Sequence, residues 1–168
     1  MATALERHGS NATWLSPCTG CLVLLLGSGA LLLGALGFQY LGGLAPCPLC
    51  VWQRVAHGAV IVLAGLGLWL LPVRIGLAMA TLAMLAGAAT AGYHVGVEQG
   101  WVASACDGGV GATTLKDLRS QIMAQSGPAC SQVAWSLLGI SMAGWNGLIS
   151  LGLAGVGLAA LLRGRPGA

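Results

Sequence analysis

The sequence predicts an all-α membrane protein, a four-helix transmembrane bundle with one long exported loop. Only 7 basic and 4 acidic residues occur among 168, while 57% of residues are hydrophobic; a soluble domain carries about a quarter charged residues. Four uncharged apolar runs are long enough to cross a hydrocarbon core about 30 Å thick. These observations exclude a soluble globular domain and a disordered chain. The net charge of +3 comes from too few charged groups to indicate nucleic-acid binding.

The four runs place the spans at about residues 21–38, 55–71, 73–93 and 141–162, in a single polytopic domain of residues 1–168. The exported loops then cover about residues 39–54 and 94–140. A tight turn at Pro72 joins the second and third spans. Residues 133–140 are assigned to the membrane interface, because residues 133–162 are too long for one span. Glycines within the runs are expected to form helix-packing faces.

The positive-inside rule orients the bundle with both termini in the cytoplasm. Four basic residues lie on the side of the termini and three on the other: Arg7, Arg74, Arg163 and Arg165 against Arg54, Lys116 and Arg119. The first run also resembles a cleavable signal peptide. Its removal would leave the orientation of the remaining spans unchanged.

The second exported loop contains one helical pattern. Thr114 and Asp117 have capping-box spacing, and Leu115, Leu118 and Ile122 recur on one helical face. We expect a short amphipathic helix on the membrane surface. A lid over hydrophobic residues and a docking element are equally consistent with this pattern.

Six cysteines form three pairs by topology. Cys47 and Cys50 precede the second span on the exported side, and Cys106 with Cys130 brackets the long exported loop. The remaining pair, Cys18 and Cys21, is cytoplasmic and is expected to be reduced and structural or incidental. A zinc site built from both CxxC motifs is excluded, because its ligands would lie on opposite sides of the bilayer. A site built from the four exported cysteines is geometrically possible but disfavoured in an oxidising compartment, so no metal is predicted.

The two exported pairs differ in what a disulfide would achieve. A bond between Cys106 and Cys130 closes a loop that is worth about 3 to 4 kcal/mol, so this pair alone has a sufficient structural explanation. A bond between Cys47 and Cys50 closes almost no loop. That spacing is typical of redox-active dithiols.

The surroundings of Cys50 favour a reactive thiolate. Pro48 suits the first helical turn, so the second span can begin at the motif itself, with Cys50 near the positive end of the helix dipole. Arg54 follows one turn later on the same face, where it stabilises a thiolate or a ligand anion. The structural alternative for Arg54 is a headgroup anchor. Beside a CxxC motif the functional interpretation is favoured.

A dithiol at the membrane edge that is oxidised repeatedly needs an electron acceptor. The sequence has no haem, flavin or iron-sulfur pattern, and a lipid-soluble quinone arriving through the bilayer fits best. The candidate binding residues are Arg54, Gln53 and His94. For His94 an interfacial polar role is the simpler explanation. His57, inside the second span, is more typical of helix packing, although an ionisable group in a membrane is a functional candidate by default.

The chain resembles the disulfide bond formation protein B family, the quinone oxidoreductases of bacterial inner membranes. The matching segments, in the family's order, are Pro46-Cys47-Pro48-Leu49-Cys50, Gln53-Arg54, Tyr93-His94, Gly96-Val97-Glu98, Cys130, Trp135, Leu138-Gly139-Ile140-Ser141-Met142-Ala143 and Trp145-Asn146. They cover most of the chain. This is far more specific than a single CxxC motif.

The resemblance implies a disulfide relay in the inner membrane, with the redox cysteines in the periplasm. A reduced, thioredoxin-like periplasmic thiol oxidase of the DsbA type attacks the disulfide between Cys106 and Cys130 and bonds to Cys106. Cys130 then attacks Cys47, which releases Cys50 as a thiolate against ubiquinone or menaquinone, with Arg54 polarising the reacting group. The surface helix would tether the mobile loop.

Two other functions compete with this one. A membrane scaffold or transport subunit stapled by disulfides explains Cys106 and Cys130, but not a CxxC motif with Arg54 one turn later. A reductase similar to the vitamin K epoxide reductases also pairs a membrane-edge CxxC motif with loop cysteines and a quinone. In that family the active motif lies late in the chain, whereas here it precedes the second span.

Overall fold

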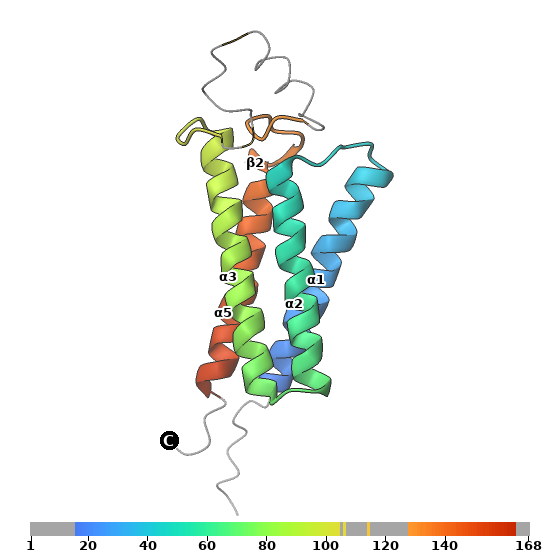
Figure 1. The fold of residues 1–168 in the computed structure, drawn as a ribbon, viewed down its shortest axis with the longest axis vertical. Helices are drawn as coiled ribbons and strands as arrows, with labels where there is room; N and C mark the ends of the chain where they lie inside the picture. Colours follow the sequence, from blue (N-terminus) through green and yellow to red (C-terminus); the bar gives the residue numbers. More distant parts are fainter. Residues whose placement is uncertain (1–15, 105, 107–113, 115–127, 164–168) are drawn as a thin grey trace, which may run out of the picture.

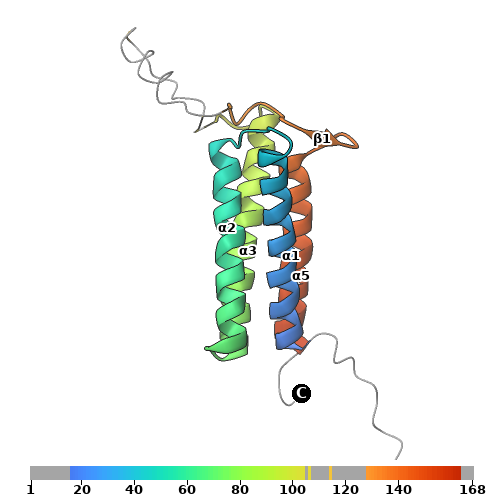
Figure 2. The ribbon, with the colours of Figure 1, turned by 90° about the vertical axis from the view of Figure 1, so that its right-hand side faces the viewer.

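The computed structural model describes residues 16–104, 106, 114 and 128–163. Within this part four helices, α1 (Pro17–Tyr40), α2 (Pro48–Trp69), α3 (Val73–Glu98) and α5 (Met142–Arg163), run side by side as a bundle (Figures 1 and 2). Each is long and apolar enough to cross a membrane. The predicted fold class is therefore confirmed: this is a multi-pass helical membrane protein.

The helices extend beyond the predicted apolar runs. α2 begins at Pro48, as expected from the proline in the CxxC motif, so residues 48–54 precede the apolar run but are helical. α3 continues to Glu98 rather than ending at residue 93. Gln53 and Arg54 interrupt the hydrophobic run without interrupting the helix, because Pro48 and the Cys47 cap start it earlier. The predicted surface helix over residues 115–122 falls outside the described residues.

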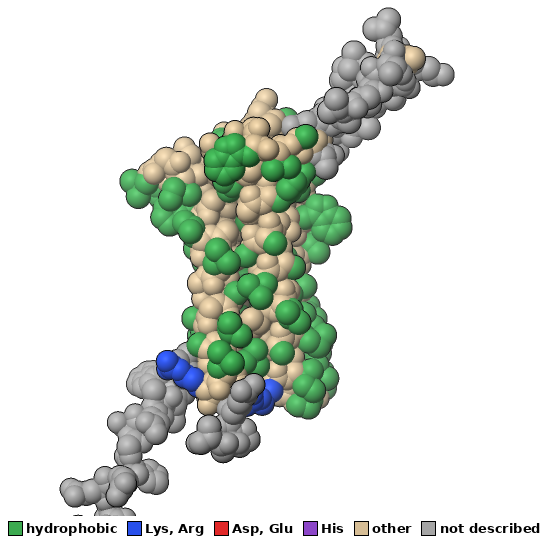
Figure 3. Space-filling model, turned by 90° about the vertical axis from the view of Figure 1, so that its left-hand side faces the viewer, with side chains coloured by type: hydrophobic (Ala, Val, Ile, Leu, Met, Phe, Trp, Pro, Cys, Tyr) green, Lys and Arg blue, Asp and Glu red, His purple; other side chains and the backbone are tan. Residues whose placement is uncertain are grey.

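The outer surface matches a bilayer environment. Leu33, Val62 and Leu82 are among many large apolar side chains that are more than half exposed on the helices, and hydrophobic side chains spread along the face in Figure 3. Arg74 and Arg163 lie at the start of α3 and the end of α5, where the lower end of that face carries its basic side chains. Exposed hydrophobic residues here face lipid rather than water.

Backbone contact holds α2 and α3 together near that lower end. A Cβ atom added at Gly67 would lie 2.9 Å from Cα of Gly76, closer than real Cβ atoms approach another atom. The neighbouring core is aliphatic and includes Leu24, Val60 and Leu77. Toward the upper end α1 leans away from α2 (Figure 1). The bundle is therefore tight at one end and open between α1 and the other helices at the other.

A two-residue antiparallel hairpin covers the open end. β1 (Ser136–Leu137) pairs with β2 (Ile140–Ser141) within the stretch predicted to be interfacial. The turn residues Leu138 and Gly139 both have positive φ, 54° and 77°, as tight hairpins with matching twist require. The Trp145 indole donates a hydrogen bond to the Leu137 carbonyl at 3.1 Å. This bond fixes the hairpin to α5.

Candidate functional site

The CxxC motif forms the first turn of α2. Cys47 is the N-cap, and its Sγ accepts a hydrogen bond from the Cys50 backbone N–H at 3.2 Å. The Sγ atoms of Cys47 and Cys50 lie 2.7 Å apart, so a small side-chain movement brings them to the bond length of about 2.05 Å in a disulfide. The hydrogen bond with the Cys50 thiol, together with burial, raises the pKa of Cys47 above its usual range. Cys47 therefore retains its proton when the pair is reduced.

The second cysteine pair, Cys106 and Cys130, packs against the first. Cys130 is fully buried in a cluster with Cys47, Leu49 and Val97, and Cys50 and Cys106 lie at the edge of that cluster. The Cys130 thiol interacts with both Cys106 and Cys47. Burial, followed by the hydrogen bond with Cys106, raises the pKa of Cys130 to about 11. All four cysteines predicted as site residues thus meet at one end of the bundle.

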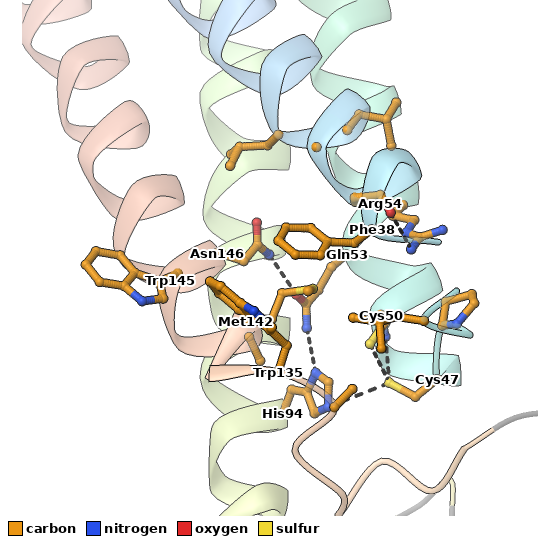
Figure 4. A pocket seen from close by; sticks show the side chains of 18 of the residues that line it. Phe38, Cys47, Cys50, Gln53, Arg54, His94, Trp135, Met142, Trp145 and Asn146 are labelled. Carbon is orange, nitrogen blue, oxygen red and sulfur yellow. Dashed lines mark hydrogen bonds between the residues drawn. The ribbon is translucent and has the colours of Figure 1, made fainter. Parts of the chain in front are cut away.

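A chain of hydrogen bonds runs from this cluster into the bundle (Figure 4). His94 Nε2 lies 3.6 Å from Cys47 Sγ, and its Nδ1 lies 2.9 Å from Gln53 Nε2. Asn146 donates from Nδ2 to Gln53 Oε1 at 2.7 Å, and its Oδ1 lies 2.8 Å from His57 Nε2. The chain links three helices, α3, α2 and α5. Polar groups that would be costly alone in a membrane therefore satisfy one another.

Glu98 lies at the outer end of this chain. Its Oε1 is 3.8 Å from His94 Nε2, and both side chains are 4% exposed. Because the two residues are four apart on α3, one helical turn brings them together. Glu98 Oε1 and Cys47 Sγ therefore lie near the same ring nitrogen, His94 Nε2.

Arg54 joins α2 to the upper part of α1. Its Nη1 donates to Gln39 Oε1, and its Nη2 donates to the Ala35 carbonyl at 3.2 Å. The side chain lies beside Phe38 in Figure 4 and lines the same cavity as Cys50. The guanidinium is thereby held at the site rather than extended toward the membrane surface.

These residues line a cavity of about 300 Å³ between α1, α2 and α5, a volume within the range of small-ligand sites. Its walls are mainly apolar, and its polar groups come from the CxxC motif, Arg54, the hydrogen-bonded chain and the segment before the hairpin: Cys47, Cys50, Gln53, Arg54, His57, His94, Glu98, Gln132 and Asn146. Phe38 and Ile149 also line it and are 37% and 41% exposed. The cavity is therefore open to the surface of the bundle.

Trp135 lines the cavity near the hairpin. Its ring packs against Phe38 with centroids 5.1 Å apart, and its carbonyl accepts a hydrogen bond from the Met142 N–H at 3.1 Å. The contact joins the end of α1 to the segment before α5.

The remaining cysteine pair is remote from this site. Cys18 is exposed and Cys21 is fully buried, in the first turns of α1, and the Cys21 thiol donates to the Val73 carbonyl at 3.7 Å. Near the other two pairs, by contrast, the possible ligand atoms of Cys47, Cys50 and His94 lie within 4.8 Å of one another. The absence of a metal centre, predicted from the sequence, stays a prediction.

Sequence reasoning assigned no role to Asn146 or Glu98, although both occur in the segments that carried the resemblance. A single amide in an apolar span is a usable signal for Asn146, because membrane helices rarely bury an unpaired polar group. For Glu98 the signal is its spacing of four residues from His94. Neither signal identifies which residue on another helix the side chain contacts.

Comparison with known proteins agrees with this geometry. The family model described as "Disulfide bond formation protein DsbB" matches residues 15–160. Similar proteins named disulfide bond formation protein B occur in Stutzerimonas stutzeri (31% identity, 88% of this chain and 96% of that relative) and in Verminephrobacter eiseniae (35% identity, 83% and 82%). A third, from Methylococcus capsulatus, is 33% identical over 74% of this chain and 81% of its own. No solved structure matches the chain. With a membrane bundle that gathers two cysteine pairs at one end, the chain belongs to the disulfide bond formation protein B family.

Proposed function

We propose that this protein is a membrane thiol:quinone oxidoreductase that reoxidises a periplasmic, thioredoxin-like thiol oxidase of the DsbA type. The observation that carries the proposal is the position of Cys130, whose thiol interacts with both Cys106 and Cys47. Two dithiol pairs in contact can exchange disulfides without a large movement of the chain. A stapled scaffold has no need of that contact.

The relay begins at the loop disulfide. A partner thiolate attacks Cys106, a new bond joins partner and Cys106, and Cys130 leaves as a thiolate. Cys130 attacks Cys47, and Cys50 leaves as a thiolate beside the cavity. The partner's second thiolate then displaces Cys106, which attacks Cys130 and frees Cys47. The partner ends with a disulfide, and the CxxC motif holds its two electrons.

The residues around the cavity fit a quinone headgroup. The cavity, open to the surface of the bundle, combines apolar walls with polar groups at its centre, and one of these, Nδ1 of His57, is buried with no hydrogen-bond partner among the described residues. When bound, ubiquinone or menaquinone supplies a mobile acceptor for two electrons and two protons. Arg54, Gln53 and His94 would hold its headgroup beside Cys50. The disulfide between Cys47 and Cys50 re-forms as the electrons leave.

The protein's own groups favour this direction of transfer. Cys47 regains a proton readily because its pKa is raised, so the reactive member of the pair is Cys50, which faces the cavity. Arg54, one helical turn from Cys50 and fixed by α1, places a permanent positive charge where a thiolate forms. Trp135 and Phe38, packed against each other, add apolar surface to the cavity wall.

We further propose that the protein lies in the bacterial inner membrane, with the cysteine cluster in the periplasm and both termini in the cytoplasm. Arg74 and Arg163 at the end opposite the cluster support this orientation by the positive-inside rule. A periplasmic location also gives the exported pairs an oxidising compartment.

The decisive experiment follows quinone reduction by the purified full-length protein in detergent after addition of the reduced thiol oxidase. We expect thiol-dependent quinol formation with ubiquinone or menaquinone. Cys50→Ala should abolish it, whereas Cys18→Ala, at the opposite end of the bundle, should leave it unchanged. No turnover with either quinone, and cysteines that remain disulfide-bonded throughout, would refute the proposal in favour of a stapled scaffold.

A further inference from the structure

His57 occupies a position in the cavity that the relay leaves unexplained. It lies seven residues after Cys50 on the same face of α2, about 10 Å deeper along the helix axis. The side chain is 5% exposed and lines the cavity. Its Nε2 pairs with Asn146, but its Nδ1 is buried and has no partner within the described part of the chain. A buried nitrogen without a partner is costly, which indicates that a ligand can pair with it.

The direction of the hydrogen bonds from His94 to His57 determines which kind of ligand can pair with His57 Nδ1. The Gln53 amide nitrogen Nε2 can only donate, so His94 Nδ1, 2.9 Å away, is the acceptor. The neutral His94 ring therefore carries its hydrogen on Nε2, the nitrogen that lies 3.6 Å from Cys47 Sγ. The orientation of the Gln53 amide thus sets the donor and acceptor roles of His94.

The same reasoning continues to His57. Gln53 uses its Nε2 on His94, so its Oε1 accepts from Asn146 Nδ2. Asn146 then presents Oδ1 to His57 Nε2, which must donate. Neutral His57 consequently carries its hydrogen on Nε2 and has a bare acceptor at Nδ1. The cavity thus contains a buried site for a ligand that donates a hydrogen bond.

We propose that His57 is a positioning residue that accepts a hydrogen bond from a quinol hydroxyl at the end of the ring away from Cys50. This inference rests on the proposed function. The oxygens of a quinone only accept hydrogen bonds, whereas quinol hydroxyls donate, so neutral His57 pairs with the reduced form alone. Reduction takes two electrons from the Cys47 and Cys50 pair, one proton from the Cys47 thiol, and a second proton that the partner dithiol released when it ionised. The proposal requires no further reactant.

The site is therefore expected to bind the quinol, its product, more tightly than the quinone, its substrate. A ligand form that gains one buried hydrogen bond, and relieves an unpaired nitrogen, is expected to bind about tenfold more tightly. By linkage, tighter binding of the quinol favours reduction at the site. His57 would thereby favour the transfer of two electrons from the CxxC motif to the quinone, although it contacts neither sulfur atom.

The test measures binding rather than turnover. In a Cys50→Ala background the full-length protein cannot pass electrons, so the affinities of a short-chain ubiquinone and its quinol can each be measured at equilibrium. Quenching of tryptophan fluorescence gives the readout, since Trp135 and Trp145 line the cavity. We expect the quinol to bind more tightly than the quinone, and His57→Phe to reduce that preference about tenfold.

Two further variants separate a hydrogen-bonding role from a packing role. His57→Gln keeps one donor and one acceptor side by side and should preserve the preference. Val62→Ala, on the lipid-facing side of α2 with Val62 59% exposed, should change neither affinity. If His57→Phe does not fold, the quinol and its dimethyl ether are compared on the protein with His57 intact, and the ether should bind about tenfold more weakly.

The outcomes distinguish this inference from the proposed function. A folded His57→Phe variant that retains the full preference for quinol, or equal binding of the quinol and its dimethyl ether, would overturn the role of His57 while leaving the oxidoreductase intact. Failure of the Cys50→Ala protein to bind either the quinone or the quinol would instead refute the quinone site, and with it both proposals.

Discussion

Cys130 provides a quantitative test of the cysteine cluster. Burial raises the pKa of its thiol to about 11 from an ordinary value of 9.0, and the hydrogen bond with Cys106 adds to the effect. A raised pKa means that the thiolate is lost as pH falls below 11 rather than below 9. At pH 7 about one Cys130 in 10,000 is then a thiolate, against about one in 100 for an unperturbed thiol. The thiolate of a thiol with a raised pKa is itself about tenfold more nucleophilic, so the observed alkylation rate at pH 7 should be about tenfold lower.

The assay is alkylation of the fully reduced protein with iodoacetamide between pH 6 and 12, with each cysteine followed by mass spectrometry. The logarithm of the Cys130 rate should rise with unit slope through neutral pH and level off near pH 11. Cys106→Ala should lower this midpoint but keep it above 9, because burial is the larger cause. A Cys130 midpoint at or below 9 in the unmodified protein would show that the thiol is neither buried nor bonded as described.

The raised pKa also constrains how the relay starts. A protonated Cys130 is a poor nucleophile, so the reduced loop pair does not attack Cys47 spontaneously. When a partner thiolate attacks Cys106, however, Cys130 leaves directly as a thiolate beside its target and needs no deprotonation. The exchange rate should consequently depend less on pH than the alkylation rate of the same residue.

Three further predictions concern packing and the order of the relay. Gly67→Ala should lower stability by about 1–3 kcal/mol, measured by thermal unfolding in detergent, because the new methyl group meets Gly76; Gly34→Ala, where nothing lies within 4 Å, should not, and equal effects would contradict the close crossing. Arg54→Met should weaken quinone reduction while leaving thiol exchange with the partner intact, and an unchanged dependence on quinone concentration would argue against its role. Cys106→Ser should abolish oxidation of the partner but still allow the CxxC disulfide to form; normal turnover would exclude the relay.

The sequence predicted the bundle well because hydropathy depends on composition alone. Four apolar runs suffice to locate four helices, whatever their neighbours. Hydropathy alone placed the second apolar run at residues 55–71, because Gln53 and Arg54 lower the local hydropathy, whereas Pro48 indicated the start of α2 at the CxxC motif that the structure shows. The hairpin at Leu138 was not predicted either, since a positive φ at leucine is uncommon and its sequence contains no Asn-Gly or Asp-Gly turn.

The site was predicted only in part for a different physical reason. Cysteine spacing and position relative to the spans identify Cys47 and Cys50 without knowledge of any other helix. The pairing of Gln53 with Asn146 depends on how α5 is rotated against α2, across 93 residues of sequence. The rotation of a membrane helix about its axis is set by its packing against neighbouring helices, and no local sequence pattern predicts it.

The two ends of the bundle show how the site can exist in a membrane. At the end away from the CxxC motif, close contact between Gly67 and Gly76 fixes α2 against α3. At the other end α1 leans away from α2 (Figure 1), and the polar groups beside the cavity pair with one another from Gln53 to His94 and Asn146. Tight backbone packing at one end therefore allows the open, polar cavity at the other. A change that loosens the glycine contact should disturb the hydrogen-bonded chain before it disturbs the CxxC turn, which Cys47 caps locally.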